Sequence, residues 1–130
     1  MNLSTWLERH ASQRPDAPAI AEGERVHATW REWAGRSAAL SGGLRDTLGL
    51  APGDRVAIVM RNRPEYLEAQ FAIWRAGLVA VPVNARLHRD EVAYVLSHSS
   101  TRVAVTDAEH AEDVSSLLGE VPSLQTVVLA

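Results

Sequence analysis

Short apolar runs that alternate with helix-like segments constrain the fold of this sequence more than any other feature. The run from Val56 to Met60 is continuously apolar, which is typical of a strand buried on both faces of a parallel sheet. Further runs stand at residues 79–83, 102–105 and 125–129, with segments of helical spacing between them. This alternation predicts right-handed crossovers and an α/β fold with a mostly parallel, doubly wound sheet.

The segment after the first run has clear helix signals. Pro64 fits the first turn of a helix, where its missing amide hydrogen costs nothing, and Asn62 is the expected N-cap. Gly77 is expected to end this helix in the left-handed conformation. We expect its buried stripe to consist of Leu67, Phe71 and Trp74.

Two further helices are expected in this part of the chain, at about residues 89–97 and near residues 108–118. The first should turn Val92, Val95 and Leu96 inward, and the second is acidic. Pro82 predicts that the strand at residues 79–83 lies at an edge or an end of the sheet, because proline has no amide hydrogen for a neighbouring strand.

The first residues of the chain predict a short helix followed by a hairpin. Thr5 and Glu8 form a capping-box pattern, which would start a helix that runs through about Gln13. Short strands at residues 19–21 and 26–28 flank a Glu-Gly-Glu turn, which suits an antiparallel hairpin.

A longer helix should follow the hairpin. Thr29 and Glu32 form a second capping-box pattern, and the helical spacing continues to about residue 48. The Gly42-Gly43 pair weakens this helix and is expected to permit close packing. The expected buried stripe is Trp33, Ser37, Leu40, Leu44 and Leu48.

Composition excludes several classes of function. The chain has 130 residues, the length of one domain, and it contains no cysteine, which excludes disulfides, thiolate nucleophiles and cysteine metal sites. All 13 basic residues are arginine, so a Schiff-base lysine and a Walker-type lysine are excluded. A net charge of −3 does not suggest nucleic-acid binding. No apolar run approaches the ~20 residues of a membrane span, and no secretory signal is evident, so we expect a cytoplasmic protein.

Familiar catalytic motifs are absent from the chain. No G-x-G-x-x-G follows a strand, no G-x-S-x-G is present, and the histidine spacings do not suggest a metal site. Asp107 follows a strand, as in a phosphoacceptor domain, but the lysine that this chemistry needs is missing. The Arg61-Asn62-Arg63 turn has the polarity to hold an anion, although the pattern favours two solvated arginines beside a capping Asn62.

Several motifs, in this order, resemble the opening of the AMP-forming acyl-CoA synthetase superfamily, and the similarity covers residues 3–129. They are Thr29-Trp30-Arg31-Glu32, Pro52-Gly53-Asp54-Arg55, Asn62-Arg63-Pro64-Glu65, Trp74-Arg75-Ala76-Gly77, the segment Val81 to Leu87, and Glu91-x-x-Tyr94-x-Leu96. The resemblance implies that residues 1–130 are the N-terminal subdomain of a larger adenylate-forming fold, cut before its phosphate-binding loop.

The resemblance also implies a reaction. A carboxylic acid and ATP would give an acyl-adenylate and pyrophosphate, and CoA would then displace AMP, with Mg²⁺ present in the full-length enzyme. The acid is expected to be fatty or aromatic. No catalytic residue and no metal ligand are expected within residues 1–130, so this segment alone should be inactive and bind no cofactor tightly.

One turn favours the acid–CoA ligase branch of the superfamily. Val83-Asn84-Ala85-Arg86 resembles a turn with the pattern V-x-N-P-R, with Ala85 in place of the usual proline. By resemblance, Arg86 contacts CoA phosphates, and a guanidinium is suited to bidentate phosphate binding. Arg89 is a weaker candidate for the same role. The structural alternative is a surface Arg86 bridged to Asp90 or Glu91.

Two other classes of function remain open from the sequence. One is a stand-alone, non-catalytic α/β module for binding or interaction, and the other is an adenylating relative of the peptide-synthetase or luciferase type. The expected partners are the remainder of the ligase chain and a small carboxylic acid, with no nucleic acid and no membrane span. A sheet with an open edge and bare apolar faces would also favour self-association.

Overall fold

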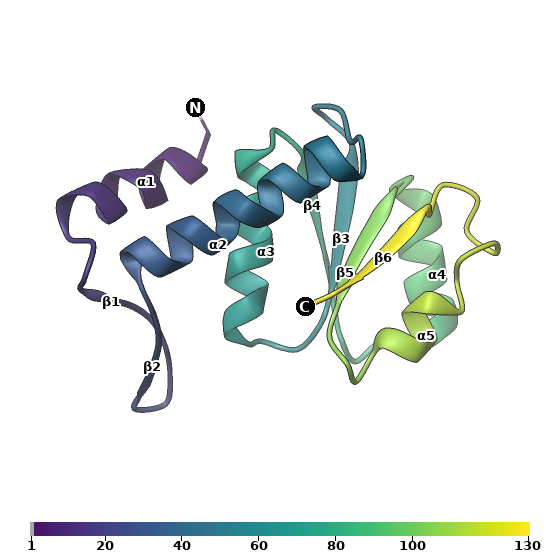
Figure 1. The fold of residues 1–130 in the computed structure, drawn as a ribbon. Coiled ribbons are helices and arrows are strands. Elements are labelled where there is room, and N and C mark those ends of the chain that lie inside the picture. The colour runs from purple at the N-terminus through teal and green to yellow at the C-terminus, as the bar shows by residue number, and fades with distance from the viewer. Residues whose placement is uncertain (1) are drawn as a thin grey trace. The chain divides into compact units, whose positions relative to one another are not determined.

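The computed structural model describes residues 2–130, which divide into two compact units. One unit comprises the residues through Pro52 together with Arg63–Leu78, and the other comprises Gly53–Asn62 together with Val79–Ala130. Figure 1 labels the elements of both. Each unit has its own core, and each is described by itself.

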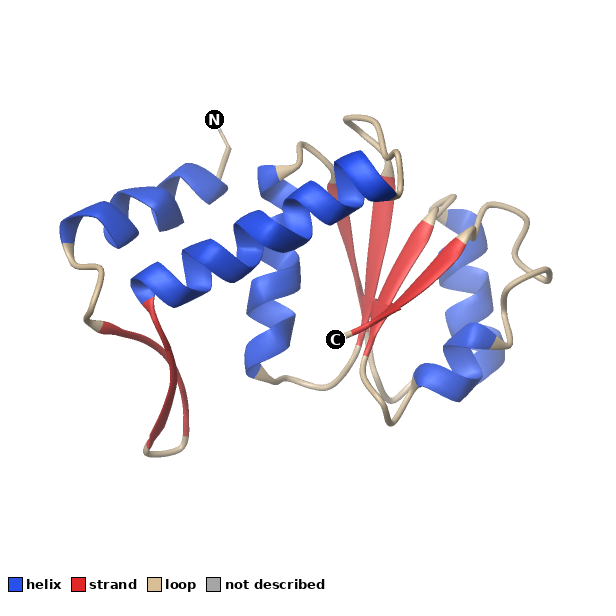
Figure 2. Ribbon diagram, in the orientation of Figure 1, coloured by secondary structure: helices blue, strands red, loops and turns tan. Residues whose placement is uncertain are grey.

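The second unit is built on a parallel four-stranded sheet (Figure 2). The strands are β3 (Arg55–Val59), β4 (Val79–Val83), β5 (Val103–Thr106) and β6 (Thr126–Leu129). Their order in the sheet is β4-β3-β5-β6, and all neighbouring pairs are parallel, as the sequence predicts. Pro82 lies in β4, which is an edge strand, and this confirms the position predicted from the missing amide hydrogen.

Two helices of the same unit pack on one face of this sheet. They are α4 (Arg89–His98) and α5 (Ala111–Ser115). Alternate strand residues such as Ala57 and Ala104 meet Leu96 of α4 and Val114 of α5 in a buried apolar cluster. The inward positions predicted for Val92 and Leu96 are confirmed, while Val95 is half-buried at the margin of the cluster. This packing fixes the loops that follow the strands.

The last helix is shorter than the predicted range of residues 108–118. Asp107 Oδ1 accepts a hydrogen bond from the backbone amide of His110 at 3.1 Å, which folds residues 108–110 into a turn before α5 begins. Leu118 forms an isolated bridge with Val121, and Gly119 has a φ of 88°, so the helix cannot continue past this point.

The first unit consists of helices and a hairpin. The hairpin strands β1 (Pro18–Glu22) and β2 (Arg25–Thr29) pair antiparallel, as predicted. Helix α2 (Trp30–Gly42) opens with the predicted capping box, in which the Glu32 amide donates to Thr29 Oγ1 and the Thr29 amide donates to Glu32 Oε2. The remaining elements are α1 (Ser4–Gln13), the π-helix η1 (Gly43–Thr47) and α3 (Pro64–Arg75).

Aromatic side chains fill the core of this unit. Trp30 and Trp33 of α2 are buried with Ile20 of the hairpin, and Phe71 of α3 packs against them. The ring centroids of Trp33 and Phe71 are 4.7 Å apart in an edge-to-face arrangement, which stabilises aromatic pairs. Of the stripe predicted for the long helix, Trp33, Ser37 and Leu44 are buried, whereas Leu40 and Leu48 are half-buried.

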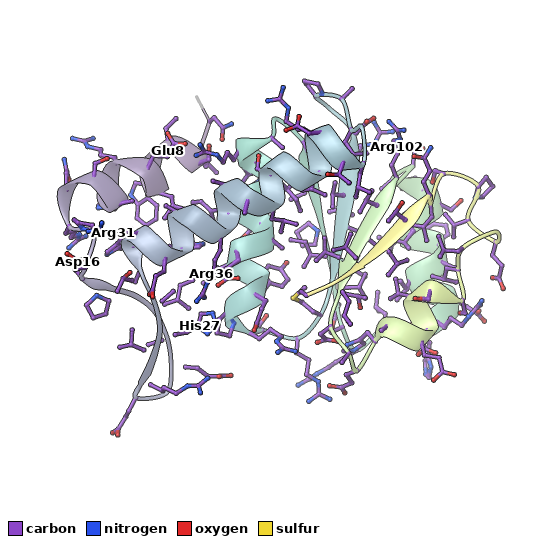
Figure 3. The ribbon with its side chains drawn as sticks, viewed as in Figure 1. Glu8, Asp16, His27, Arg31, Arg36 and Arg102 are labelled. Atoms are coloured by element: carbon purple, nitrogen blue, oxygen red, sulfur yellow. The ribbon has the colours of Figure 1, made fainter. Side chains whose placement is uncertain are left out.

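A polar cluster joins the hairpin to two helices of the first unit, and Figure 3 labels two of its residues, His27 and Arg36. Glu68 Oε1 of α3 lies 3.0 Å from His27 Nε2 of β2 and 2.9 Å from Arg36 Nη1 of α2. The carboxylate of Glu68 is mostly buried, so its contacts are shielded from water. The hydrogen bond with Glu68 raises the pKa of Arg36. The cluster therefore fixes the three elements against one another.

Helix α1 does not use its predicted capping box. The Ser4 amide donates to Asn2 Oδ1 at 3.0 Å, and Thr5 Oγ1 donates to the Asn2 carbonyl. Glu8 instead forms an ion pair with Arg75 of α3. The prediction was wrong because a carboxylate that pairs with another helix is not available to the helix start.

Two predictions for α3 also need correction. Its N-cap is Arg63 rather than Asn62, and no side chain caps the helix, although Pro64 occupies the first turn as expected. Leu67 is exposed and Phe71 and Trp74 are half-buried, whereas the buried positions of the helix include Ala69, Ala72 and Ile73. The Phe71 ring packs on Trp33 of α2, and the Trp74 ring packs on Phe71 of the same helix. The left-handed end at Gly77 is confirmed, with a φ of 74°.

The Gly42-Gly43 pair marks a change in helix type rather than a close contact. A Cβ at Gly43 would meet no atom within 4 Å, and one at Gly42 would meet only Asp46 Oδ2 at 3.9 Å. The chain continues from α2 into the π-helix, where the Leu48 amide donates to the Gly43 carbonyl at 3.0 Å. The predicted close packing is wrong. Instead, the two glycines, which are weak helix formers, lie where the α-helix changes to the wider π-helix.

This geometry predicts opposite effects for two glycine substitutions. Gly43→Ala should stabilise the chain by about 0.5–1 kcal/mol, because the Gly43 φ of −58° suits alanine and the added methyl meets nothing. Gly77→Ala should destabilise it, because alanine is strained at a φ of 74°. Urea unfolding compares the two variants, and a destabilised Gly43→Ala protein would contradict the open geometry.

Candidate functional site

The carboxyl ends of β3, β4 and β5 lie at the same edge of the parallel sheet. In open α/β sheets, ligands bind at this edge, in the loops that follow the strands. The loop after β3 carries Arg61, the turn after β4 carries Asn84 to Arg86, and the turn after β5 carries Asp107 to His110. These loops form the candidate site.

Asp107 lies at the centre of these loops. Its side chain is only 2% exposed, and it accepts hydrogen bonds from His110 Nδ1 at 2.6 Å, from the His110 amide at 3.1 Å and from the Arg61 amide at 3.3 Å. Burial raises the pKa of Asp107, but these hydrogen bonds outweigh it and leave the pKa below its ordinary value. The residue is therefore an ionised carboxylate in this site.

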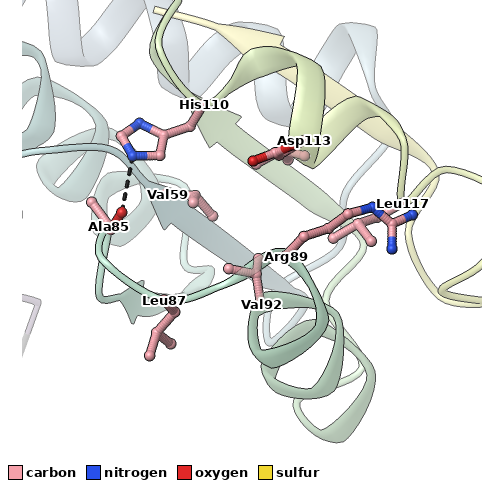
Figure 4. A pocket seen from close by; sticks show the side chains of 9 residues that line it. Val59, Ala85, Leu87, Arg89, Val92, His110, Asp113 and Leu117 are labelled. Atoms are coloured by element: carbon pink, nitrogen blue, oxygen red, sulfur yellow. Dashed lines mark hydrogen bonds between the residues drawn. The ribbon is translucent and has the colours of Figure 1, made fainter.

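His110 extends the network to the turn after β4. Its Nδ1 faces Asp107, and its Nε2 lies 3.0 Å from the carbonyl oxygen of Ala85 (Figure 4). The hydrogen bond with Asp107 raises the pKa of His110, and partial burial opposes this effect without cancelling it. The loop after β3 and the turn after β4 are thus both tied to the turn after β5.

Arg86 lies at the tip of the turn after β4. Asn84 Oδ1 accepts a hydrogen bond from the Arg86 amide at 2.9 Å, which shapes the turn. The Arg86 residue is exposed, and no ion pair of its side chain is present in residues 2–130. Asp90 instead pairs with Arg89, and Glu91 accepts from the His88 amide. The bridge from Arg86 to Asp90 or Glu91 is not formed.

Arg89 has a structural set of partners. Its Nε donates to Ser116 Oγ at 2.6 Å, and its Nη2 donates to Glu120 Oε1 at 2.5 Å and to the Ser116 carbonyl at 3.2 Å. The hydrogen bond with Glu120 raises the pKa of Arg89. Its guanidinium therefore joins the start of α4 to the chain that follows α5.

The arginines of the Arg61-Asn62-Arg63 turn both have acidic neighbours. Arg61 Nη2 donates to Glu109 Oε1 at 2.6 Å, and Arg63 Nε donates to Glu65 Oε2 at 2.9 Å. Both side chains are still exposed to solvent, as expected, at 70% for Arg61 and 39% for Arg63, but the expected Asn62 cap is wrong, because no side chain caps α3. The anion site considered at this turn gains no support, because its charges are already paired.

A small hollow lies beside His110, between the turn after β4 and helices α4 and α5 (Figure 4). Its volume of about 20 Å³ is enough for a single water molecule and far too small for a substrate. The residues that line it include Ala85, Leu87, Arg89, His110 and Asp113.

Within residues 2–130, no cluster of three or more His, Cys, Asp or Glu side chains could hold a metal ion. None of the described helices is both long enough and apolar enough to cross a bilayer.

Sequence reasoning missed the network of Asp107 and His110. Asp107 was considered only as a phosphoacceptor, and the histidines were considered only as metal ligands. The available signal was an aspartate directly after a buried strand with a histidine three residues later, a spacing that permits a local hydrogen bond. Nothing local indicated the contact with Ala85, which is 25 residues away.

Comparison with known proteins establishes the family of the chain. The model of the family described as "AMP-binding enzyme" matches residues 7–130. The chain is 42% identical over 115 residues to a feruloyl-CoA synthase of Amycolatopsis sp, covering 88% of the chain and 23% of that relative. It is 35% identical over 132 residues to a long-chain-fatty-acid–CoA ligase of Thermus thermophilus, covering 99% and 24%.

A solved structure supports the same assignment. The inhibitor-bound N-terminal domain of FACL13 from Mycobacterium tuberculosis is 28% identical, with a TM-score of 0.90, and the match covers 99% of the chain and 33% of that domain. The chain therefore belongs to the AMP-binding enzyme family. It spans about a quarter of the length of the curated relatives it matches.

Proposed function

We propose that this chain is the N-terminal subdomain of an AMP-forming acid–CoA ligase. The whole enzyme would convert a carboxylic acid, ATP and CoA to acyl-CoA, AMP and pyrophosphate through an acyl-adenylate. Relatives named as ligases of fatty acids and as a feruloyl-CoA synthase support a fatty or aromatic acid as the substrate. The enzyme would be cytoplasmic.

The role of residues 1–130 would be to support sites that the rest of the enzyme completes. The resemblance to the superfamily implies that the phosphate loop and the adenine contacts lie in later sequence. The described residues 2–130 contain no cluster of metal ligands, and the groups that hold Mg²⁺ and ATP would belong to the later sequence. We expect this segment alone to be inactive and to bind neither ATP nor CoA tightly.

CoA phosphate is the group that this segment fits. The supporting observation is the exposed Arg86 at the carboxyl edge of the sheet, with no acidic partner in the described chain. A guanidinium there can donate two hydrogen bonds to one phosphate. Arg89 remains a weaker candidate, because binding phosphate would cost its contacts with Ser116 and Glu120.

The test is Arg86→Ala in the ligase that contains this chain. We expect the KM for CoA to rise about tenfold, which corresponds to about 1.4 kcal/mol of binding free energy. The rate of ATP–pyrophosphate exchange, which reports the adenylation step alone, should stay unchanged. Steady-state kinetics measure the KM for CoA in the overall reaction and the rate of ATP–pyrophosphate exchange separately.

Two control variants sharpen the test. Arg86→Lys keeps the charge and loses the bidentate geometry, so its KM for CoA should be intermediate. Arg25→Ala removes a highly exposed arginine of the hairpin and should leave both half-reactions unchanged. If Arg86→Ala has the wild-type KM for CoA, Arg86 has no role in binding CoA.

A further inference from the structure

Besides Asn84, a side chain from the turn after β5 contacts the turn that presents Arg86. His110 Nε2 contacts the carbonyl of Ala85, the residue directly before Arg86, at 3.0 Å. The same imidazole is anchored through Nδ1 to the buried carboxylate of Asp107 at 2.6 Å. Asp107 in turn accepts from the backbone amide of Arg61. Figure 4 shows the imidazole reaching from the turn after β5 to Ala85.

The partners of His110 determine its protonation state. A carboxylate and a backbone carbonyl are both hydrogen-bond acceptors, and neither has a proton to donate. A neutral imidazole has one N–H group and could satisfy only one of them. Both contacts can be hydrogen bonds only when His110 is an imidazolium, with a proton on each ring nitrogen.

The charged groups around the imidazole come from each surrounding element. Asp107 and Glu109 lie in the same turn as His110, and Asp113 lies in α5. Arg89 of α4 lines the same hollow, and Arg61 follows β3. Arg89 is paired with Glu120, and Arg61 is paired with Glu109. The raised pKa of His110, caused mainly by its hydrogen bond with Asp107, is consistent with this balance.

We propose that His110 is a positioning residue for the CoA half-reaction: as an imidazolium anchored to Asp107, it holds the Ala85 carbonyl and so orders the turn that presents Arg86. This inference rests on the proposed role of Arg86. His110 itself touches neither substrate nor cofactor. It acts only through the turn, which makes binding of CoA dependent on the proton that His110 carries.

Loss of that proton should release the turn. The remaining proton stays on Nδ1, because the ionised carboxylate of Asp107 is a stronger acceptor than a carbonyl. Nε2 then presents a lone pair to the lone pairs of the Ala85 oxygen, and this contact is lost. The turn is held below the raised pKa of His110 and becomes free as the pH rises through it.

The experiment compares the ligase that contains this chain with its His110→Gln variant between pH 6.5 and pH 9. At pH 6.5 the variant should have a KM for CoA about threefold to tenfold above wild type, the range expected for loss of one hydrogen bond. The ratio of the two KM values should fall toward one at pH 9. Because CoA titrates equally in both measurements, the ratio of the two KM values is free of the effect of its titration. The KM for ATP in pyrophosphate exchange should stay unchanged at every pH.

The matched control is His98→Gln, which changes an exposed histidine near the end of α4 and should give the wild-type profile. A ratio that does not vary with pH, or an equal rise in the KM for ATP, would overturn the inference. Should His110→Gln fail to fold, ¹⁵N-histidine NMR of the wild-type enzyme gives a direct answer. His110 must then carry protons on both nitrogens at pH 6.5, and a neutral ring at that pH would refute the proposal.

The two proposals fail in different ways. If Arg86→Ala leaves the KM for CoA unchanged, the proposed CoA contact fails, and the positioning role fails with it. If Arg86→Ala raises the KM and His110→Gln does not, only the positioning role fails. If both are correct, the double variant should bind CoA no more weakly than Arg86→Ala alone, because His110 acts through Arg86.

Discussion

Replacing Asp107 with asparagine is expected to destabilise the chain by about 3 kcal/mol near pH 6, within the range for removing one charge from a buried ion pair. The change keeps the shape of the side chain and removes its charge. The Asp107 side chain is almost fully buried, so water cannot replace the lost carboxylate. The His110 imidazolium and two backbone amides would face a weaker acceptor.

The pH dependence of the free energy of unfolding distinguishes a charged pair of Asp107 and His110 from ordinary packing. The pKa of His110 is raised in the folded chain, so its contribution to stability is complete below its ordinary pKa of 6.5 and is lost as the pH rises through the raised value. The destabilisation by Asp107→Asn should therefore shrink between pH 6 and pH 9. Urea unfolding at several pH values measures it, and a constant difference would contradict a charged pair.

Replacing Leu96 with alanine is expected to cost about 2–5 kcal/mol of the free energy of unfolding. Leu96 is fully buried where α4 packs on the sheet, in the cluster that contains Ala57, Ala104 and Leu117. The substitution would remove apolar contacts and leave a cavity that a sheet on one side and helices on the other cannot close. Urea or thermal unfolding of the variant measures the loss.

The matched control is Tyr94→Ala on the same helix. The Tyr94 residue is 67% exposed, and its ring stacks on His98 at the surface. Its loss should change the free energy of unfolding by no more than about 0.5 kcal/mol, as for most surface substitutions. Equal effects of the two substitutions would show that the inward face of α4 is not the one described.

The strands and the hairpin could be predicted from the sequence because their signals are local. The continuous apolar run from Val56 indicates a strand buried on both faces, and the proline in β4 indicates an edge strand. Neither signal depends on the rest of the chain. The capping box of Thr29 and Glu32 was predictable for the same reason, since its two hydrogen bonds span three residues.

The errors occurred where a distant residue decided the outcome. Glu8 satisfies a local capping pattern but pairs with Arg75, 67 residues away. Which positions of α3 are buried depends on which elements pack against the helix, and in the structure these positions include Ala69 and Ala72. The glycine pair of the long helix is the opposite case: it was expected to permit close packing, but no neighbour approaches, and a Cβ at Gly43 would meet open space.

In the candidate site, too, local features could be predicted and contacts between distant residues could not. The sequence by itself determined the type of sheet, because the apolar runs are local, and its resemblance to the acyl-CoA synthetase superfamily indicated Arg86 as a candidate contact for CoA phosphate. Only the tertiary structure decided that Arg89 is committed to Ser116 and Glu120, and that His110 joins Asp107 to Ala85. A hydrogen bond depends on the position of two atoms in space, and packing of α4 and α5 on the sheet brings these atoms together.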